Sequence, residues 1–210
     1  YASRLNFSVD EITESCHELI RDDEMLAPSV EDGKIHWADL NIWLPEPSQW
    51  VAPDGNWRRM KFEAKECLCH GDFHSRNLLV DENASLWLID YERVAQSHWL
   101  RDIVELETDI KFKLKEDISI KEFYTLENGL FFILDGTANS HRDAVNRLSP
   151  QVRRIHRILA NLRRDALNRF ALEENPGEYY CALLISTLYT MQLKSTSIAK
   201  IKQAYLSASL

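Results

Sequence analysis

The chain has 210 residues, of which 45% are hydrophobic and 28% are charged, and its formal net charge is -8 at pH 7. These values are typical of a folded domain with a sizeable core and exclude disorder over the whole length. The acidic balance and the lack of a long apolar run disfavour nucleic acid and membrane as partners, and four cysteines without a dense spacing favour a reducing, cytoplasmic setting.

The segment before residue 66 is predicted to contain one helix followed by irregular structure. Ser8 is a typical helix N-cap, and the sequence behind it, VDEITESCHELIRDDEML, has apolar side chains at helical spacing and acids in its first turn. Residues 28–65 are interpreted as an irregular insertion, because LPEPSQWVAPDGNW contains three prolines and a Pro-Asp-Gly turn signal. We interpret the tryptophans of this insertion as a packed cover.

Short strands and then helices are predicted for the rest of the chain. ECLCH, NLLVD and SLWLID are strand-like runs, and DENA is a turn, so Leu78–Val80 and Leu86–Ile89 form a predicted hairpin. From residue 97 onward the apolar spacing is helical. We therefore expect a mainly α fold with one small β hairpin, divided into the insertion at 28–65, a hairpin segment at 66–92 and a helical subdomain at 97–210.

One of the predicted helices has an apolar face and an arginine-rich face. It starts with Ser149 as N-cap and Pro150 at the first helical position. Its apolar stripe comprises Ile155, Ile158, Leu159, Leu162, Ala166 and Phe170. Residues 142–169 hold eight arginines and two acids, and opposite the stripe lie Arg153, Arg154, Arg157 and Arg164. The arginine-rich face of residues 150–170 is either a solvated surface or a docking surface for an acidic protein partner or a phosphate-bearing ligand.

The segment CLCHGDFHSRNLLVD, residues 67–81, carries the densest ionisable chemistry of the chain. Asp72 is followed five residues later by Asn77, and Asp90 lies at the end of the second hairpin strand. Phosphoryl transfer from a nucleotide needs a carboxylate that accepts the proton of the attacking hydroxyl, and oxygen ligands for Mg²⁺. A loop aspartate, an asparagine and a strand aspartate supply such a set, which predicts a phosphotransferase site.

The sequence HGDFHSRNLLVD…LWLIDYE resembles the catalytic loop and metal-binding strand of aminoglycoside-phosphotransferase-like kinases, including choline-kinase relatives. LIDYERVAQSHWLRDIVELE also resembles the predicted phosphotransferases among bacterial ternary-complex-associated conflict-system domains. The resemblance implies the large lobe of a protein-kinase-like fold, which uses ATP and Mg²⁺ to phosphorylate a hydroxyl of a small-molecule substrate. It implies Asp72 as catalytic base, Asn77 and Asp90 as ligands of the metal and nucleotide, His70 and Asp102 as braces of the loop, and supporting positions at His74 and Glu92.

Two zinc sites are alternative interpretations of the same segment. Cys67, Cys69 and His70 are potential ligands, but zinc sites usually space cysteines two to four apart and need a second pair. His70, Asp72 and His74 alternate, so on a strand they would face one side and could bind zinc for hydrolysis. That interpretation leaves the LIDYE strand without a role.

Four acids follow the predicted site, namely Glu92, Glu105, Glu107 and Asp109. We interpret them mainly as exposed helix acids, and contact with ammonium groups of a substrate is the alternative. The acceptor itself is not specified, because a pocket built from divergent helices carries no motif.

The sequence contains no recognisable nucleotide-binding small lobe. It has no Gly-x-Gly-x-x-Gly loop, and Lys34, Lys61 and Lys65 do not lie in a Val-Ala-Ile-Lys-like strand. Either the chain is the large lobe of a longer kinase, or the small lobe is lost and the domain is a non-catalytic interaction or regulatory module. The intact phosphotransferase set favours the first explanation, because a decayed site has no physical reason to keep its metal ligands.

Overall fold

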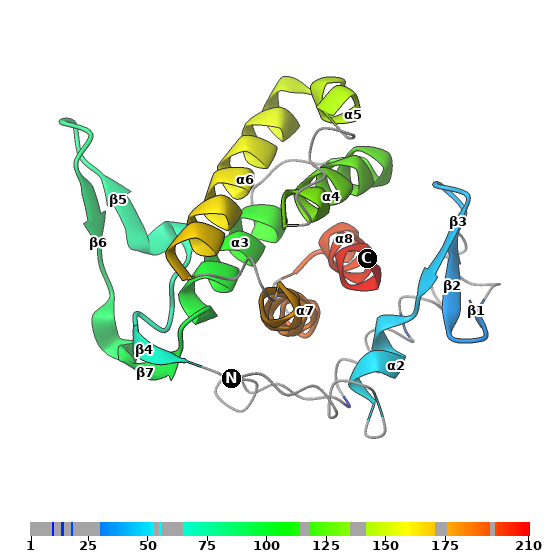
Figure 1. The fold of residues 1–210 in the computed structure, drawn as a ribbon, viewed down its shortest axis with the longest axis horizontal. Helices are drawn as coiled ribbons and strands as arrows, with labels where there is room; N and C mark the ends of the chain where they lie inside the picture. Colours follow the sequence, from blue (N-terminus) through cyan, green and yellow to red (C-terminus); the bar gives the residue numbers. More distant parts are fainter. Residues whose placement is uncertain are drawn as a thin grey trace.

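The computed structural model describes residues 30–52, 55, 65–113, 118–134, 142–170, 176–193 and 196–210, together with Asp10, Glu14 and Glu18. The helix predicted behind Ser8 lies outside the described residues. The described chain has a body of helices with small antiparallel sheets on opposite sides of it (Figure 1). The prediction of a mainly α protein is therefore confirmed, but the described residues form three small sheets where a single hairpin was predicted.

Part of the segment predicted as an irregular insertion, residues 28–65, is regular, so that prediction is wrong over residues 30–51. The segment contains an antiparallel sheet of β1 (Val30–Glu31), β2 (Lys34–Trp37) and β3 (Ile42–Pro45), followed by α2 (Pro47–Val51). Asp32 and Gly33 connect β1 to β2 and both have positive φ, which is typical of two-residue hairpin turns. The Asp-Gly pair is the sequence signal of this hairpin, and the nearby prolines obscure it.

Two short antiparallel pairs carry the polar segment. β4 (Glu66–Cys69) pairs with β7 (Ala95–His98), and β5 (Leu78–Val80) pairs with β6 (Leu86–Leu88). Short 3-10 helices, η3 (Ser75–Asn77) and η4 (Tyr91–Arg93), follow β4 and β6. The predicted β5–β6 hairpin is confirmed, whereas β7 was missed because AQSH lacks the apolar alternation of a half-buried strand.

The rest of the described chain is helical. Its helices are α3 (Arg101–Lys113), α4 (Ile120–Leu134), α5 (Arg142–Asn146), α6 (Pro150–Phe170), α7 (Gly177–Met191) and α8 (Ile198–Ser209). Within the described parts of 97–210, the helical prediction fails at the beginning, where β7 precedes α3. Within the described ranges, none of these helices is both long and apolar enough to cross a membrane.

The main core lies between α4, α6 and α8 and includes two side chains of β2. Ile35 and Trp37 are buried there, and the Trp37 ring centroid lies 6.0 Å from that of Tyr205 on α8. A smaller cluster contains Val104 of α3 and Leu183 of α7. Because β2 contributes to the main core, the β1–β3 sheet is anchored to the helical body.

The amphipathic helix α6 largely follows its predicted pattern. Ile155, Leu159 and Ala166 of the apolar stripe are buried, but Ile158 is 42% exposed, so the stripe is narrower than predicted. The arginines predicted opposite the stripe are exposed. Arg163 differs from them because it is buried between helices.

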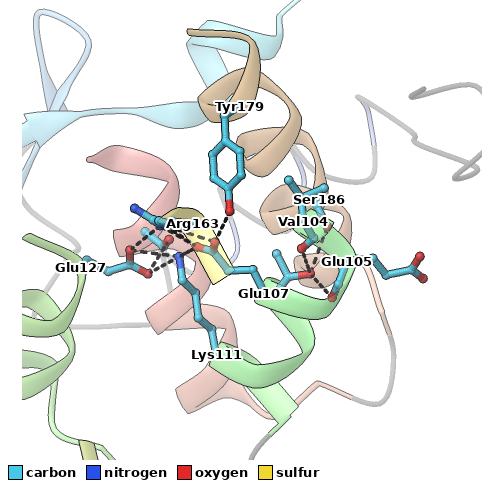
Figure 2. A network of polar contacts seen from close by, with 10 residues as sticks. Val104, Glu105, Glu107, Lys111, Glu127, Arg163, Tyr179 and Ser186 are labelled. Carbon is cyan, nitrogen blue, oxygen red and sulfur yellow. Dashed lines mark hydrogen bonds and ion pairs between the residues drawn. The ribbon is translucent and has the colours of Figure 1, made fainter. Parts of the chain in front are cut away.

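Arg163 belongs to a buried network of charges that links α3, α4, α6 and α7 (Figure 2). Glu107 Oε1 lies 2.5 Å from Arg163 Nη2 and 2.7 Å from Lys111 Nζ, and Lys111 Nζ lies 2.9 Å from Glu127 Oε1. Burial alone would raise the pKa of Glu107, but Arg163 and Lys111 together hold that pKa well below its usual range. Tyr179 donates a hydrogen bond to Glu107 at 2.5 Å, and its burial raises its own pKa.

Candidate functional site

Asp102, in the first turn of α3, fixes the beginning of the loop that follows β4. Its two carboxylate oxygens accept hydrogen bonds from the backbone amides of His70, at 2.7 Å, and Gly71, at 2.9 Å. Arg101 Nη2 donates a hydrogen bond to the Gly71 carbonyl oxygen at 2.5 Å. Because each of these bonds has a charged partner, it is stronger than a bond between neutral groups. Arg101 and Asp102, at the start of α3, therefore bind both an acceptor and two donors of the loop backbone.

Two further carboxylates of α3 hold the next part of the loop. Glu105 accepts a hydrogen bond from the Phe73 amide at 3.2 Å, and Asp109 accepts one from the Ser75 amide at 2.8 Å. Burial raises the pKa of Glu105, and the bond from Phe73 opposes this rise. Side chains three and four positions apart lie on one face of a helix. One face of α3, at positions 102, 105 and 109, therefore fixes the loop along its length.

His70 and Asn77 connect the loop to the end of the β5–β6 hairpin. His70 Nε2 lies 2.9 Å from the carbonyl oxygen of Ile89, and because a carbonyl only accepts, Nε2 carries the hydrogen. The amide of the same Ile89 donates to the Asn77 carbonyl oxygen at 3.0 Å. The His70 ring also contacts Phe73 and Tyr91. The residue that precedes Asp90 is thus bound to the loop at two points.

Gly71 is the position where the loop requires glycine. Its φ is +83°, and an added Cβ would overlap the backbone carbonyl oxygen of Arg93. Gly71→Ala is therefore expected to lower the free energy of unfolding by about 2 kcal/mol, measured by urea unfolding. Gly33 also has positive φ, but an added Cβ there meets the movable side chain of Gln49, so Gly33→Ala should lose less. Equal losses in the two variants would contradict the role of the Arg93 contact.

Asp72 and Asn77, the predicted base and metal ligand, lie together in the loop. The Asp72 side chain is 21% exposed, and Arg93 Nη1 donates to its Oδ1 at 3.3 Å. His74 Nε2 lies 3.8 Å from Asp72 Oδ2, which is too far for a hydrogen bond. Asn77 is buried, and its Nδ2 donates to the Asp72 carbonyl oxygen at 2.9 Å. No described residue donates a hydrogen bond to the Asn77 Oδ1, so this oxygen is available to a ligand.

Asp90 and Glu92 lie at the end of the hairpin and are both exposed. Asp90 has φ 66° and ψ 67°, the left-handed conformation, and it is the N-cap position of η4. Non-glycine residues in this conformation are uncommon and are concentrated at functional sites. The structure therefore gives Asp90 an unusual backbone geometry beside the loop, whereas Glu92 has an ordinary exposed position in η4.

The structure corrects two interpretations of acidic and metal-binding residues. Glu107 and Asp109 are buried and hydrogen-bonded, so they are not the exposed helix acids that were predicted. Burial and a contact with Cys67 raise the pKa of the Cys69 thiol to about 12. Within the described ranges, no three His, Cys, Asp or Glu side chains are grouped to hold a metal ion, so neither zinc alternative is supported.

Arg93 and Arg101 contact the loop and were not predicted as site residues. Arg101 immediately precedes Asp102, which was predicted to brace the loop, and this position is the sequence signal that could have identified Arg101. Arg93 reaches Asp72 across 21 residues, and no local pattern predicts such a contact.

Exposed apolar side chains lie on β4, on the β5–β6 hairpin and on the segment that follows this hairpin. We call this set the hairpin surface; it consists of Leu68, Leu79, Val80, Leu86, Trp87, Ile89, Tyr91 and Val94. The β5–β6 hairpin extends away from the helices (Figure 1). Neighbouring strand residues point to opposite faces, and both Leu79 and Val80 are exposed, so apolar side chains of both faces are in contact with solvent. A set of exposed apolar side chains of this kind on a folded protein is typical of an interaction site.

The chain matches one protein family over most of its length. The sequence pattern of ternary complex associated domain 9 matches residues 21–192, which include the loop, the hairpin and α3. No curated protein and no solved structure matches the chain at a significant level. The likeness to ternary-complex-associated domains is thus confirmed, whereas the likeness to kinases has no counterpart among these matches. Since the match spans well over half of its residues, the chain belongs to the ternary complex associated domain 9 family.

Proposed function

We propose that the chain is the catalytic large lobe of a phosphotransferase, which transfers the terminal phosphoryl group of ATP to a hydroxyl of a small molecule. The observation that carries this proposal is the pairing of Asp72 with Asn77. Asp72 presents a partly exposed carboxylate, and its backbone carbonyl accepts a hydrogen bond from the Asn77 amide, whose oxygen accepts none from the described residues. The bonds of Ile89 to the loop bring Asp90 to the same region.

The donor atoms of this loop fit Mg²⁺. Asn77 Oδ1 and the Asp90 carboxylate are hard oxygen ligands, and Mg²⁺ in proteins uses one or two carboxylates together with water and phosphate oxygens. The Asn77 nitrogen is engaged by the Asp72 carbonyl, which leaves the oxygen as the atom available to a cation. When bound, Mg²⁺ would offset the negative charge of the nucleotide phosphates.

In this proposal Asp72 acts as the general base. Arg93 donates to Oδ1 and orients the carboxylate, so Oδ2 is the atom that accepts the proton of the substrate hydroxyl. The carboxylates of α3 hold the loop backbone, which keeps Asp72 in a constant position relative to Asn77. Positioning of this kind supplies a large part of catalysis in phosphoryl transfer.

Asp72→Asn is expected to lower the rate of phosphoryl transfer by at least about a hundredfold, because an amide cannot accept the proton. The rate is measured with the full-length protein as transfer of labelled phosphate from ATP, with Mg²⁺, to a panel of small hydroxyl compounds. The exposed Asp165→Asn on α6 is the matched control and should retain the rate. A rate that survives in Asp72→Asn would remove Asp72 from the role of base.

A non-catalytic interaction module is the second candidate, and the hairpin surface favours it. Leu68 and Val80 are each 68% exposed, and Trp87 is 60% exposed, which is unfavourable in water unless another surface covers them. The exposed arginines of α6 provide a further surface, suited to an acidic protein partner. In this candidate function, the loop is retained as a structural support of the hairpin.

Calorimetry with ATP and Mg²⁺ on the full-length protein separates the two candidates. Metal-dependent ATP binding that is lost in Asp90→Asn supports the phosphotransferase and contradicts a purely scaffolding role. Absence of any ATP binding contradicts the phosphotransferase and leaves the interaction module.

A further inference from the structure

A cavity of about 400 Å³ lies between the β3–α2 segment, α7 and the end of α8. Its walls are mostly apolar and include Trp50 of α2, Phe131 of α4 and Tyr180 of α7. A second hollow shares the part of the wall formed by Glu46 and Trp50. The volume lies within the range of small-molecule sites, which are apolar hollows with a few polar groups.

Glu46 is a charged group in the wall of both hollows. Its side chain is buried, the Ser48 hydroxyl donates to one carboxylate oxygen, and Gln49 Nε2 donates to the other at 3.1 Å. Both donors are neutral, and no lysine, arginine or histidine among the described residues pairs with this carboxylate. A buried carboxylate without a counter-charge is unfavourable, so the site is suited to a cation.

A second polar group of the wall comes from α7. Thr187 is 1% exposed, and its hydroxyl has no hydrogen-bond partner within the described part of the chain. Buried hydroxyls are nearly always paired, so this one is suited to a polar group of a ligand. Thr187 and Glu46 are thus two polar groups in a wall that is otherwise mostly apolar.

The cavity is separate from the loop that carries Asp72. Tyr180, Leu184 and Thr187 are three or four positions apart and line the cavity from one face of α7. Tyr179 and Ser186, on the other side of α7, contact α3. The loop is bound to α3, and α3 contacts α7, so α3 and α7 lie between the loop and the cavity. Figure 1 shows α3 and α7 between the β4–β7 pair and α2.

We propose that this cavity binds an organic ammonium ion with an apolar body. Glu46 provides the negative charge, and Trp50, Phe131 and Tyr180 provide aromatic surface for the apolar body and for the cation. The Thr187 hydroxyl provides a hydrogen bond to a polar substituent. The proposal does not depend on the phosphotransferase function, because the cavity and the loop share no residue.

Phenylbutylamine and phenylbutanol, which have nearly the same size, are the probes, and calorimetry with the purified full-length protein measures their affinities. We expect the amine to bind at least about tenfold more tightly than the alcohol. Glu46→Gln should remove this difference by weakening only the amine. Glu82→Gln, an exposed substitution in the β5–β6 turn, is the control and should change neither affinity.

A second measurement locates the site on the protein. Cys181 lines the cavity and is half-buried, whereas Cys67 is exposed on β4. Bound amine should slow the alkylation of Cys181 and leave that of Cys67 unchanged. Leu184→Trp fills the cavity and should weaken both probes, which gives a test that does not depend on the folding of Glu46→Gln. Equal affinity for amine and alcohol, no binding of either, or unchanged amine binding in both variants would overturn the proposal.

Discussion

Replacing Glu107 with glutamine is expected to lower the free energy of unfolding by about 3–5 kcal/mol. Glu107 is fully buried between Arg163 and Lys111, so its neutralisation leaves one buried positive charge without compensation. Urea unfolding followed by tryptophan fluorescence measures the loss. The exposed Glu82→Gln should leave the free energy of unfolding unchanged within about 0.5 kcal/mol.

A double variant tests whether this loss of stability is caused by an unbalanced buried charge. Lys111→Met alone should also destabilise, because it leaves an acid without its partner. Glu107→Gln combined with Lys111→Met restores neutrality, so the loss should be clearly smaller than the sum of the two single losses. Strict additivity of the two substitutions would contradict the charge-balance explanation.

The pH dependence of the same variant provides an independent measurement. The neighbouring cations hold the pKa of folded Glu107 well below its usual range, whereas the pKa of a glutamate in the unfolded chain is about 4.3. A depressed pKa in the folded state contributes stability above the unfolded pKa, and this stability is lost as pH falls toward the folded pKa. The difference between the parent protein and Glu107→Gln should therefore be constant near neutral pH and decrease below about pH 4.

Asp102→Asn is expected to lower the free energy of unfolding by about 2–3 kcal/mol and to loosen the loop. The substitution removes the charge from two hydrogen bonds and places an amide NH₂ against a backbone donor, either that of His70 or that of Gly71. These bonds join segments 31 or 32 residues apart, so weakening them loosens the start of the loop, while Glu105 and Asp109 still hold its later part. Urea unfolding measures the stability, and amide hydrogen exchange at Gly71 measures the local opening, which should become faster.

Asp81→Asn is the matched control for Asp102→Asn. Asp81 also accepts two backbone hydrogen bonds, from Asn83 at 2.9 Å and Ser85 at 2.8 Å, but it is in a local turn at the surface. Hydrogen bonds at an exposed position are replaced by water, so this variant should lose less than about 1 kcal/mol. If Asp81→Asn destabilised the protein as much as Asp102→Asn, the long-range contacts of Asp102 would not be the cause.

Features with a local pattern were predictable from the sequence. The β5–β6 hairpin follows from alternating apolar residues around the DENA turn, and α6 follows from Pro150 and the apolar spacing behind it. The spacing of Asp72, Asn77 and Asp90 predicts a shared site, and their roles stay a prediction. For the hairpin and for α6, the signal lies within one hairpin or one helix, which is the range over which periodicity and turn residues act.

Features that depend on tertiary contacts were not predictable. β7 is a strand because β4 pairs with it, although its own sequence has no apolar alternation. Arg163 was one of eight arginines in residues 142–169, and only its contact with Glu107, 56 residues earlier, distinguishes it. Likewise, nothing in the local sequence distinguishes the acids of α3 from solvent-exposed helix acids. Asp109 is nevertheless buried, because it contacts the loop. Pairing of distant segments overrides the local preference at such positions.

The three carboxylates on one face of α3 restrict where this family can vary in length. Each residue of an α-helix turns the chain by about 100°. One residue inserted between Asp102 and Asp109 would therefore rotate Asp109 away from Ser75 while Asp102 stayed in place, and the loop would lose a contact. The turn at 81–85 is exposed and has no such constraint. Insertions and deletions among family members should accordingly occur in the hairpin turn and be absent from the first two turns of α3.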